Sequence, residues 1–66
     1  MSPEKMVTMA NQIATFFDTQ PGDAPDKIAA HLKDYWEPRM REQLKSYIAT
    51  GGTGLRPSVE QAAQRL

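Results

Sequence analysis

Few side chains in this sequence have the type and spacing that catalysis or metal binding requires. His31 is the single histidine, and no serine or second histidine stands at a recognisable spacing from it, so a nucleophilic triad is not indicated. The chain has no cysteine, which excludes disulfides, thiolate-bound zinc and all-cysteine iron–sulfur sites. The glycine-rich run at residues 51–54 lacks the Lys-Ser/Thr ending of a P-loop. We therefore expect no catalytic, cofactor-binding or metal-binding residue in this chain.

Two amides in the first segment have the chemistry of a protein–protein contact. Asn11 and Gln12 lie in the middle of a predicted helix, where asparagine is a mediocre helix former. At 100° per residue Asn11 points away from the apolar stripe of that helix. Its amide can donate and accept hydrogen bonds, so it could contact a partner's backbone. The alternative interpretation is a tolerated residue that faces solvent.

A second group of candidate contacts lies around residue 38. Trp36 ends a predicted helix on its apolar stripe, where it would anchor the corner of a bundle; the alternative is a contact hot spot, in which tryptophan is enriched. Pro38 follows, and Arg39 should project outward from the next helix. Arg39 and Arg41 could make bidentate contacts with a partner's carboxylates, or they could serve solubility alone.

Prolines and glycines divide the sequence into four segments, and we expect a helix in each. Proline is favoured in the first turn of a helix, where its missing N–H is not needed. Each segment carries such a proline: Pro3, Pro25, Pro38 and Pro57. Ser2 and Asp23 precede the first two helices and can cap them. The breaks fall at residues 19–22, at Glu37 and at residues 51–54.

Apolar residues recur at spacings of three and four in each segment, which predicts one buried stripe per helix. The first stripe consists of Met6, Met9, Ala10, Ile13, Phe16 and Phe17. The next three are Ile28, Leu32, Tyr35 and Trp36; Met40, Leu44, Tyr47 and Ile48; and Val59, Ala62, Ala63 and Leu66. The last helix is short and alanine-rich, so we expect it to be loosely held unless a partner covers it. The sequence predicts an all-α fold, a small compact bundle of three main helices plus a short C-terminal helix.

Length and charge narrow the class of protein. A core built from 66 residues is expected to supply no more than about 3–5 kcal/mol of net stability, and without disulfides or a metal the expected additional support is another protein chain. The formal net charge is zero, which argues against nucleic-acid binding. No apolar run is long enough for a membrane span, and the first five residues do not resemble a signal peptide. We therefore expect a cytoplasmic protein.

Three motifs resemble the delta subunit of NAD-dependent formate dehydrogenase. Residues 9–13, Met-Ala-Asn-Gln-Ile, followed by two phenylalanines, look like its opening motif. Residues 36–41, Trp-Glu-Pro-Arg-Met-Arg, look like its central motif, and residues 54–59 resemble its closing motif. The resemblance runs from about Lys5 to Leu66. It departs from the family pattern at Glu37, where aspartate is usual, and at Arg56, where a small capping residue is common.

The resemblance implies one delta-subunit domain over residues 1–66, in a non-catalytic accessory subunit of a soluble, cytoplasmic complex. That complex oxidises formate with NAD to carbon dioxide and NADH. Its other subunits are expected to carry a molybdenum or tungsten bis-pterin cofactor, iron–sulfur clusters and FMN, and to bind NAD. This chain would bind the large catalytic subunit and support assembly, maturation or stability, without nucleic-acid or membrane partners.

On this hypothesis six residues contact the partner: Asn11, Gln12, Trp36, Pro38, Arg39 and Arg41. Two alternatives from other classes remain open. One is a small helical DNA-binding or regulatory module, which the zero net charge disfavours. The other is a free-standing homo-oligomeric interaction protein, which a concentration-dependent mass in solution would reveal.

Overall fold

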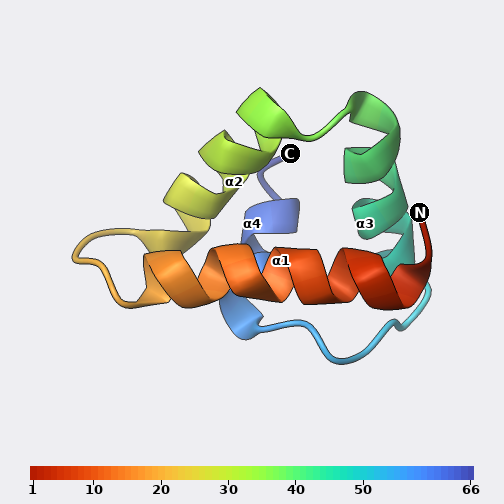
Figure 1. The fold of residues 1–66 in the computed structure, drawn as a ribbon, viewed down its shortest axis with the longest axis horizontal. Coiled ribbons are helices and arrows are strands. Elements are labelled where there is room, and N and C mark those ends of the chain that lie inside the picture. Colours follow the sequence, from red (N-terminus) through yellow and green to blue (C-terminus); the bar gives the residue numbers. More distant parts are fainter.

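The computed structural model describes all 66 residues and contains four α-helices and no strand (Figure 1). The helices are α1 (Pro3–Asp18), α2 (Ala24–Tyr35), α3 (Pro38–Ala49) and α4 (Pro57–Ala63). The all-α bundle of three main helices and a short fourth helix is therefore confirmed. None of the four combines the length and the hydropathy that crossing a bilayer requires.

The helix starts follow from local chemistry. The hydroxyl of Ser2 accepts a hydrogen bond from the backbone N–H of Lys5, and the carboxylate of Asp23 accepts one from Asp26 N–H, so both predicted caps are confirmed. The side chains before α3 and α4 make no capping bond. These are Glu37 and Arg56, the two positions at which the sequence departs from the family pattern.

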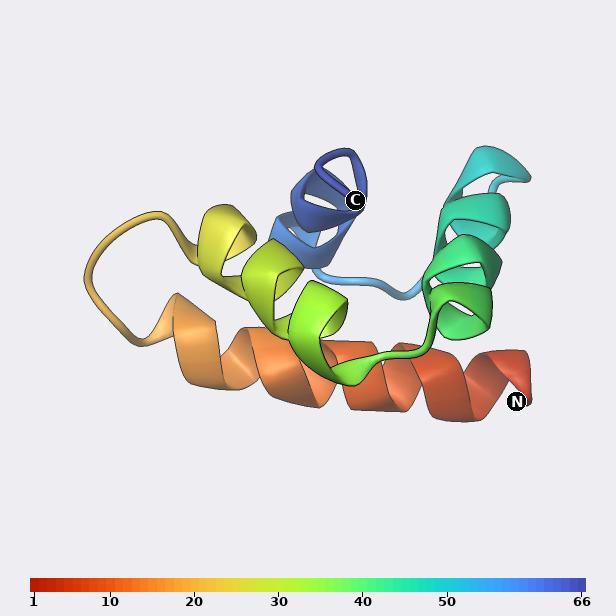
Figure 2. The same ribbon diagram turned by 90° about the horizontal axis from the view of Figure 1, so that it is seen from above.

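The short fourth helix lies at the centre of the bundle. Figure 2 shows α2, α3 and α4 on the same side of the long α1, and in Figure 1 α4 lies between α2 and α3; it packs against all three other helices. Val59 and Ala62 are completely buried, and Ala63 is nearly so. The prediction that α4 is loosely held is wrong, because its small side chains let the neighbouring helices approach closely and enclose it.

Eleven apolar residues form one core, and every buried residue is apolar. They are Met6, Ala10, Ala14, Ile28, Ala29, Leu32, Trp36, Leu44, Val59, Ala62 and Ala63. Seven further residues assigned to buried stripes are half-buried against this core, whereas Phe16 is 59% exposed and Tyr35 is 75% exposed. The buried side of α1 is centred on Met6, Ala10 and Ala14, which leaves Phe16 at its edge.

Candidate functional site

Four rings from α1 and α2 form a continuous row on the surface, called here the aromatic row: Phe16, Phe17, His31 and Tyr35. The ring centroids of Phe16 and Phe17 are 5.1 Å apart, edge to face. Phe17 meets His31 across the two helices at 5.9 Å, and His31 lies 4.7 Å from Tyr35. The two inner rings are half-buried and the two outer rings are exposed. The row therefore presents two anchored, solvent-facing rings.

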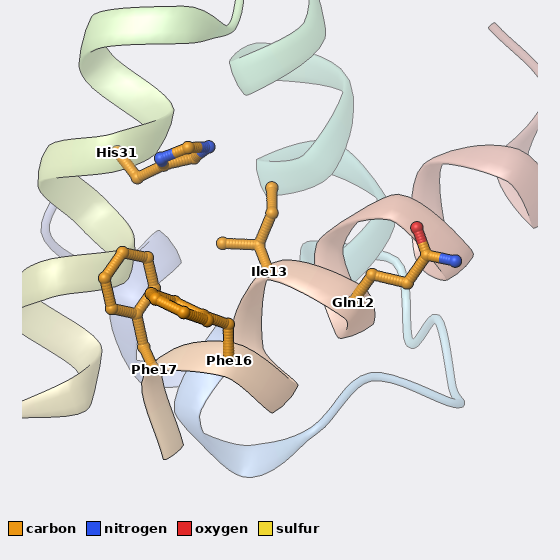
Figure 3. Close-up of a pocket in the computed structure, with 5 residues that line it drawn as sticks. All are labelled: Gln12, Ile13, Phe16, Phe17 and His31. Atoms are coloured by element: carbon orange, nitrogen blue, oxygen red, sulfur yellow. The ribbon is translucent and has the colours of Figure 1, made fainter. Parts of the chain in front are cut away.

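A hollow of about 310 Å³ opens beside this row. Its walls come from α1 and α2 and consist of Gln12, Ile13, Phe16, Phe17 and His31. Figure 3 shows the two phenyl rings on one side of Ile13 and Gln12 on the other, with His31 facing them from α2. No lysine, arginine, aspartate or glutamate lines it. A hollow with these walls can bind an apolar side chain, and it holds no nucleophile or general base in a catalytic arrangement.

A second, separate hollow of about 280 Å³ lies nearer the start of α1 and is lined by Glu4, Lys5, Thr8 and Met9. Residues three and four apart lie on the same side of a helix. The side of α1 that carries both hollows is called here the free strip: Lys5, Thr8, Met9, Gln12, Ile13 and Phe16. Each of its side chains is exposed or half-buried.

Asn11 lies on a different side of α1, and its amide contacts this chain's own backbone. The amide N–H of Asn11 donates to the carbonyl oxygen of Gly54 at 2.8 Å, and its carbonyl oxygen accepts from the backbone N–H of Arg56 at 3.0 Å. The interpretation of Asn11 as a residue free to face solvent is therefore wrong. Its amide joins α1 to the closing segment, defined here as residues 51–56.

The closing segment is also fixed from α3. The hydroxyl of Tyr47 donates to the carbonyl oxygen of Thr53 at 2.7 Å. A Cβ on Gly52 would stand 2.3 Å from the Tyr47 ring, so only glycine fits there without a shift. At the far end of the segment, Arg56 and Asp18 form an ion pair at 3.5 Å. These contacts hold the segment between α1 and α3 and so position α4.

The central motif is divided between the interior and the surface. Trp36 is only 6% exposed and belongs to the core. Arg41 is half-buried, and its guanidinium donates to the carbonyl oxygens of Leu32, Lys33 and Trp36 at the end of α2. A cation is favourable at that end of a helix dipole. Pro38 and Arg39 are exposed.

The six predicted contact residues therefore do not form one surface. Gln12 lies on the free strip, whereas Pro38 and Arg39 lie at the start of α3, which Figure 1 shows well away from α1. Asn11, Trp36 and Arg41 are engaged within the chain. Sequence reasoning missed the exposed ends of the aromatic row, because Phe16 and Tyr35 have helical spacing from core residues. Ala14 could have indicated that Phe16 is exposed. If Ala14 is counted as buried together with Met6 and Ala10, the buried side of α1 is centred away from Phe16.

One charged cluster joins α2 to Arg65, beyond the end of α4. Arg65 lies 3.1 Å from Asp23 and 3.8 Å from Asp26. The hydrogen bond from the backbone N–H of Asp26, with a further contribution from Arg65, lowers the pKa of Asp23 below its ordinary value. The carboxylate of Asp23 thus caps α2 and receives Arg65 in its charged form.

The residues of this chain do not fit the redox cofactors of a formate dehydrogenase. There is no cysteine and only one histidine, and no group of three or more histidine or carboxylate side chains is arranged to hold a metal ion. An iron–sulfur cluster requires a set of thiolate ligands that this sequence does not contain.

A comparison with protein-family models gives a match that covers most of the chain. A family model described as NADH-dependent formate dehydrogenase delta subunit FdsD matches residues 5–63. No curated protein shows significant similarity to the chain. The matched range contains the opening, central and closing motifs, which confirms the resemblance seen in the sequence.

Proposed function

Because this chain belongs to the family of NADH-dependent formate dehydrogenase delta subunits, we propose that it is a non-catalytic accessory subunit of that enzyme. In this proposal it binds the large catalytic subunit and supports the assembly, maturation or stability of the complex. The observation that carries the proposal is the family match over residues 5–63, nearly the whole of the 66-residue chain.

The chemistry of the side chains supports a non-catalytic role. The hollow of about 310 Å³ has no lysine, arginine, aspartate or glutamate in its walls, and the only histidine lies between Phe17, which it meets edge to face, and Tyr35. The oxidation of formate by NAD needs redox groups for which this chain has no ligands. We therefore propose that the molybdenum or tungsten bis-pterin cofactor, the iron–sulfur clusters, FMN and the NAD site belong to other subunits of a cytoplasmic complex.

The six motif residues have two kinds of role in this proposal. Gln12, Pro38 and Arg39 are exposed and contact the partner directly. The other three, Asn11, Trp36 and Arg41, hold the surfaces that present them. The single domain of residues 1–66 then offers a partner two places to bind, one on α1 and one at the start of α3.

Co-purification tests the proposal. An affinity-tagged copy of this chain, expressed with the subunits of the dehydrogenase, is expected to retain the large subunit. Recovery of the tagged chain alone would contradict the accessory role. Trp36→Ala is unsuitable as a contact variant, because removing a buried tryptophan costs about 3–5 kcal/mol and would unfold a domain this small.

Arg39→Ala tests the contact at the start of α3, and Lys33→Ala is its matched control. Both residues are exposed cations, and the side chain of neither makes a hydrogen bond or ion pair within the chain. If Arg39 binds a partner carboxylate, Arg39→Ala lowers the amount of large subunit retained and Lys33→Ala does not. Equal retention by the two variants would exclude Arg39 as a contact without affecting the accessory role.

A further inference from the structure

We infer that the free strip of α1 and the aromatic row together form the docking surface for an uncharged, apolar segment of another subunit of the formate dehydrogenase. This inference rests on the proposed function and identifies the face of the chain that binds. None of the four residues of the aromatic row is among the six contact residues predicted from the sequence.

Two large side chains of the proposed surface are exposed to solvent although neighbouring rings hold them in place. Phe16 and Tyr35 are 59% and 75% exposed, and each packs against a half-buried ring behind it. Exposed apolar patches on small proteins mark interaction sites. Rings that are already fixed lose little conformational entropy when a partner covers them, which makes them effective anchors.

The lack of charged side chains in the hollow beside the aromatic row indicates what kind of segment fits it. The chain has eight basic and eight acidic residues, yet none of them lines the hollow beside the aromatic row. An occupant with a charged side chain would lose hydration there without gaining an ion pair, so the matching segment is uncharged. The hollow of about 310 Å³ has room for a large apolar side chain from that segment. At the other end, Lys5 of the free strip and the neighbouring Glu4 offer one charge of each sign.

The area that a stable complex buries requires a partner that covers more than the aromatic row. At about 200 Å² per aromatic side chain, the exposed parts of Phe16 and Tyr35 amount to roughly 270 Å². A stable complex buries about 800 Å² on each partner, which is about one fifth of the 4171 Å² surface of this chain. A contact limited to the aromatic row falls short of that area. The segment of the other subunit must therefore also extend along the free strip.

Substitutions to glutamine test the docking surface, because glutamine keeps helix propensity and removes the ring. The chain is tagged and expressed with the dehydrogenase subunits, and the retained large subunit is measured per tagged chain. Phe16→Gln/Tyr35→Gln is expected to lower that ratio about tenfold or more, as hot-spot truncations do. Ala30→Gln, an exposed position elsewhere on α2, is the matched control and should leave the ratio unchanged.

Three results separate the possible outcomes. If the double variant retains as much large subunit as the wild-type chain, the inferred docking surface is wrong and the proposed function is unaffected. No retention by the wild-type chain overturns the proposed function itself. If the purified wild-type chain is a dimer in light scattering and the double variant is a monomer, the occupant is a second copy and the inference is wrong. If the double variant does not show the circular dichroism signal of a helical fold, the test is repeated with Tyr35→Gln alone, which changes the more exposed ring.

Discussion

The backbone N–H of Arg56 donates a hydrogen bond to the side-chain oxygen of Asn11 at 3.0 Å, across 45 positions of the sequence. The same amide donates to the carbonyl oxygen of Gly54. One side chain in the opening motif thereby satisfies two backbone groups of the closing segment. The two motifs lie at opposite ends of the chain and are adjacent in the fold, which explains why asparagine is useful in the middle of α1 despite its poor helix propensity.

Asn11→Ala should destabilise the fold by about 1–2 kcal/mol, because two hydrogen bonds are lost and each contributes about 0.5–1.5 kcal/mol. The free energy of unfolding, measured by urea titration of the helical circular dichroism signal, checks this. Gln12→Ala is the matched control, since its side chain makes no hydrogen bond within the chain. Equal stability of the two variants would show that the Asn11 bonds contribute nothing.

Gly52→Ala should cost about 1–3 kcal/mol through overpacking, because the new Cβ would stand 2.3 Å from the Tyr47 ring. The double variant Gly52→Ala/Tyr47→Ala removes the obstructing ring. In thermal unfolding it should be about as stable as Tyr47→Ala alone. Strictly additive losses in the double variant would mean that the ring is not the obstacle.

Arg41→Ala should lower stability by about 1–2 kcal/mol, because the carbonyl oxygens at the end of α2 lose a charged donor. Arg39→Ala should change it by less than about 0.5 kcal/mol, as is usual for an exposed residue. Melting temperatures of the two variants at one pH and salt concentration compare the neighbouring arginines directly. The reverse order would contradict the assignment of Arg41 to the α2 cap.

Acid should weaken the fold through Asp23. Its pKa is lowered in the folded state, so the stabilisation is fully present above the unfolded value of about 3.9 and is lost as the pH falls through the folded pKa. Asp23→Asn keeps an N-cap that does not titrate. The melting temperature of this variant should therefore fall less between pH 5 and pH 2.5 than that of the wild-type chain. An identical fall in both would remove Asp23 as a source of the acid sensitivity.

Much of the fold can be predicted from local signals. The prolines and the caps at Ser2 and Asp23 locate the helix starts, because a missing N–H and a side-chain acceptor act within one turn. The central place of α4 could not be predicted in this way. It depends on how closely Ala62 and Ala63 let other helices approach, which is a property of the assembled bundle.

The candidate site was less accessible to sequence reasoning. Helical periodicity places Phe16 and Tyr35 on apolar stripes, but the edge of a stripe is buried only if a neighbouring helix covers it. Asn11 and Arg41 bond to backbone groups that only the folded chain brings close to them. Their side-chain chemistry alone was equally compatible with contacts to a partner. A role in partner binding stays a prediction for all six motif residues: direct contact for Gln12, Pro38 and Arg39, and support of the contact surfaces for the other three.

The activity of the dehydrogenase with and without this chain tests the accessory role most directly. Formate-dependent NADH formation would be measured on enzyme isolated from cells that express the other subunits with or without this chain, normalised to the large subunit. The account predicts a large loss of activity or of intact complex without the chain, and no activity of the isolated chain. Equal activity and subunit composition in the two preparations, or formate oxidation by the chain alone, would contradict it.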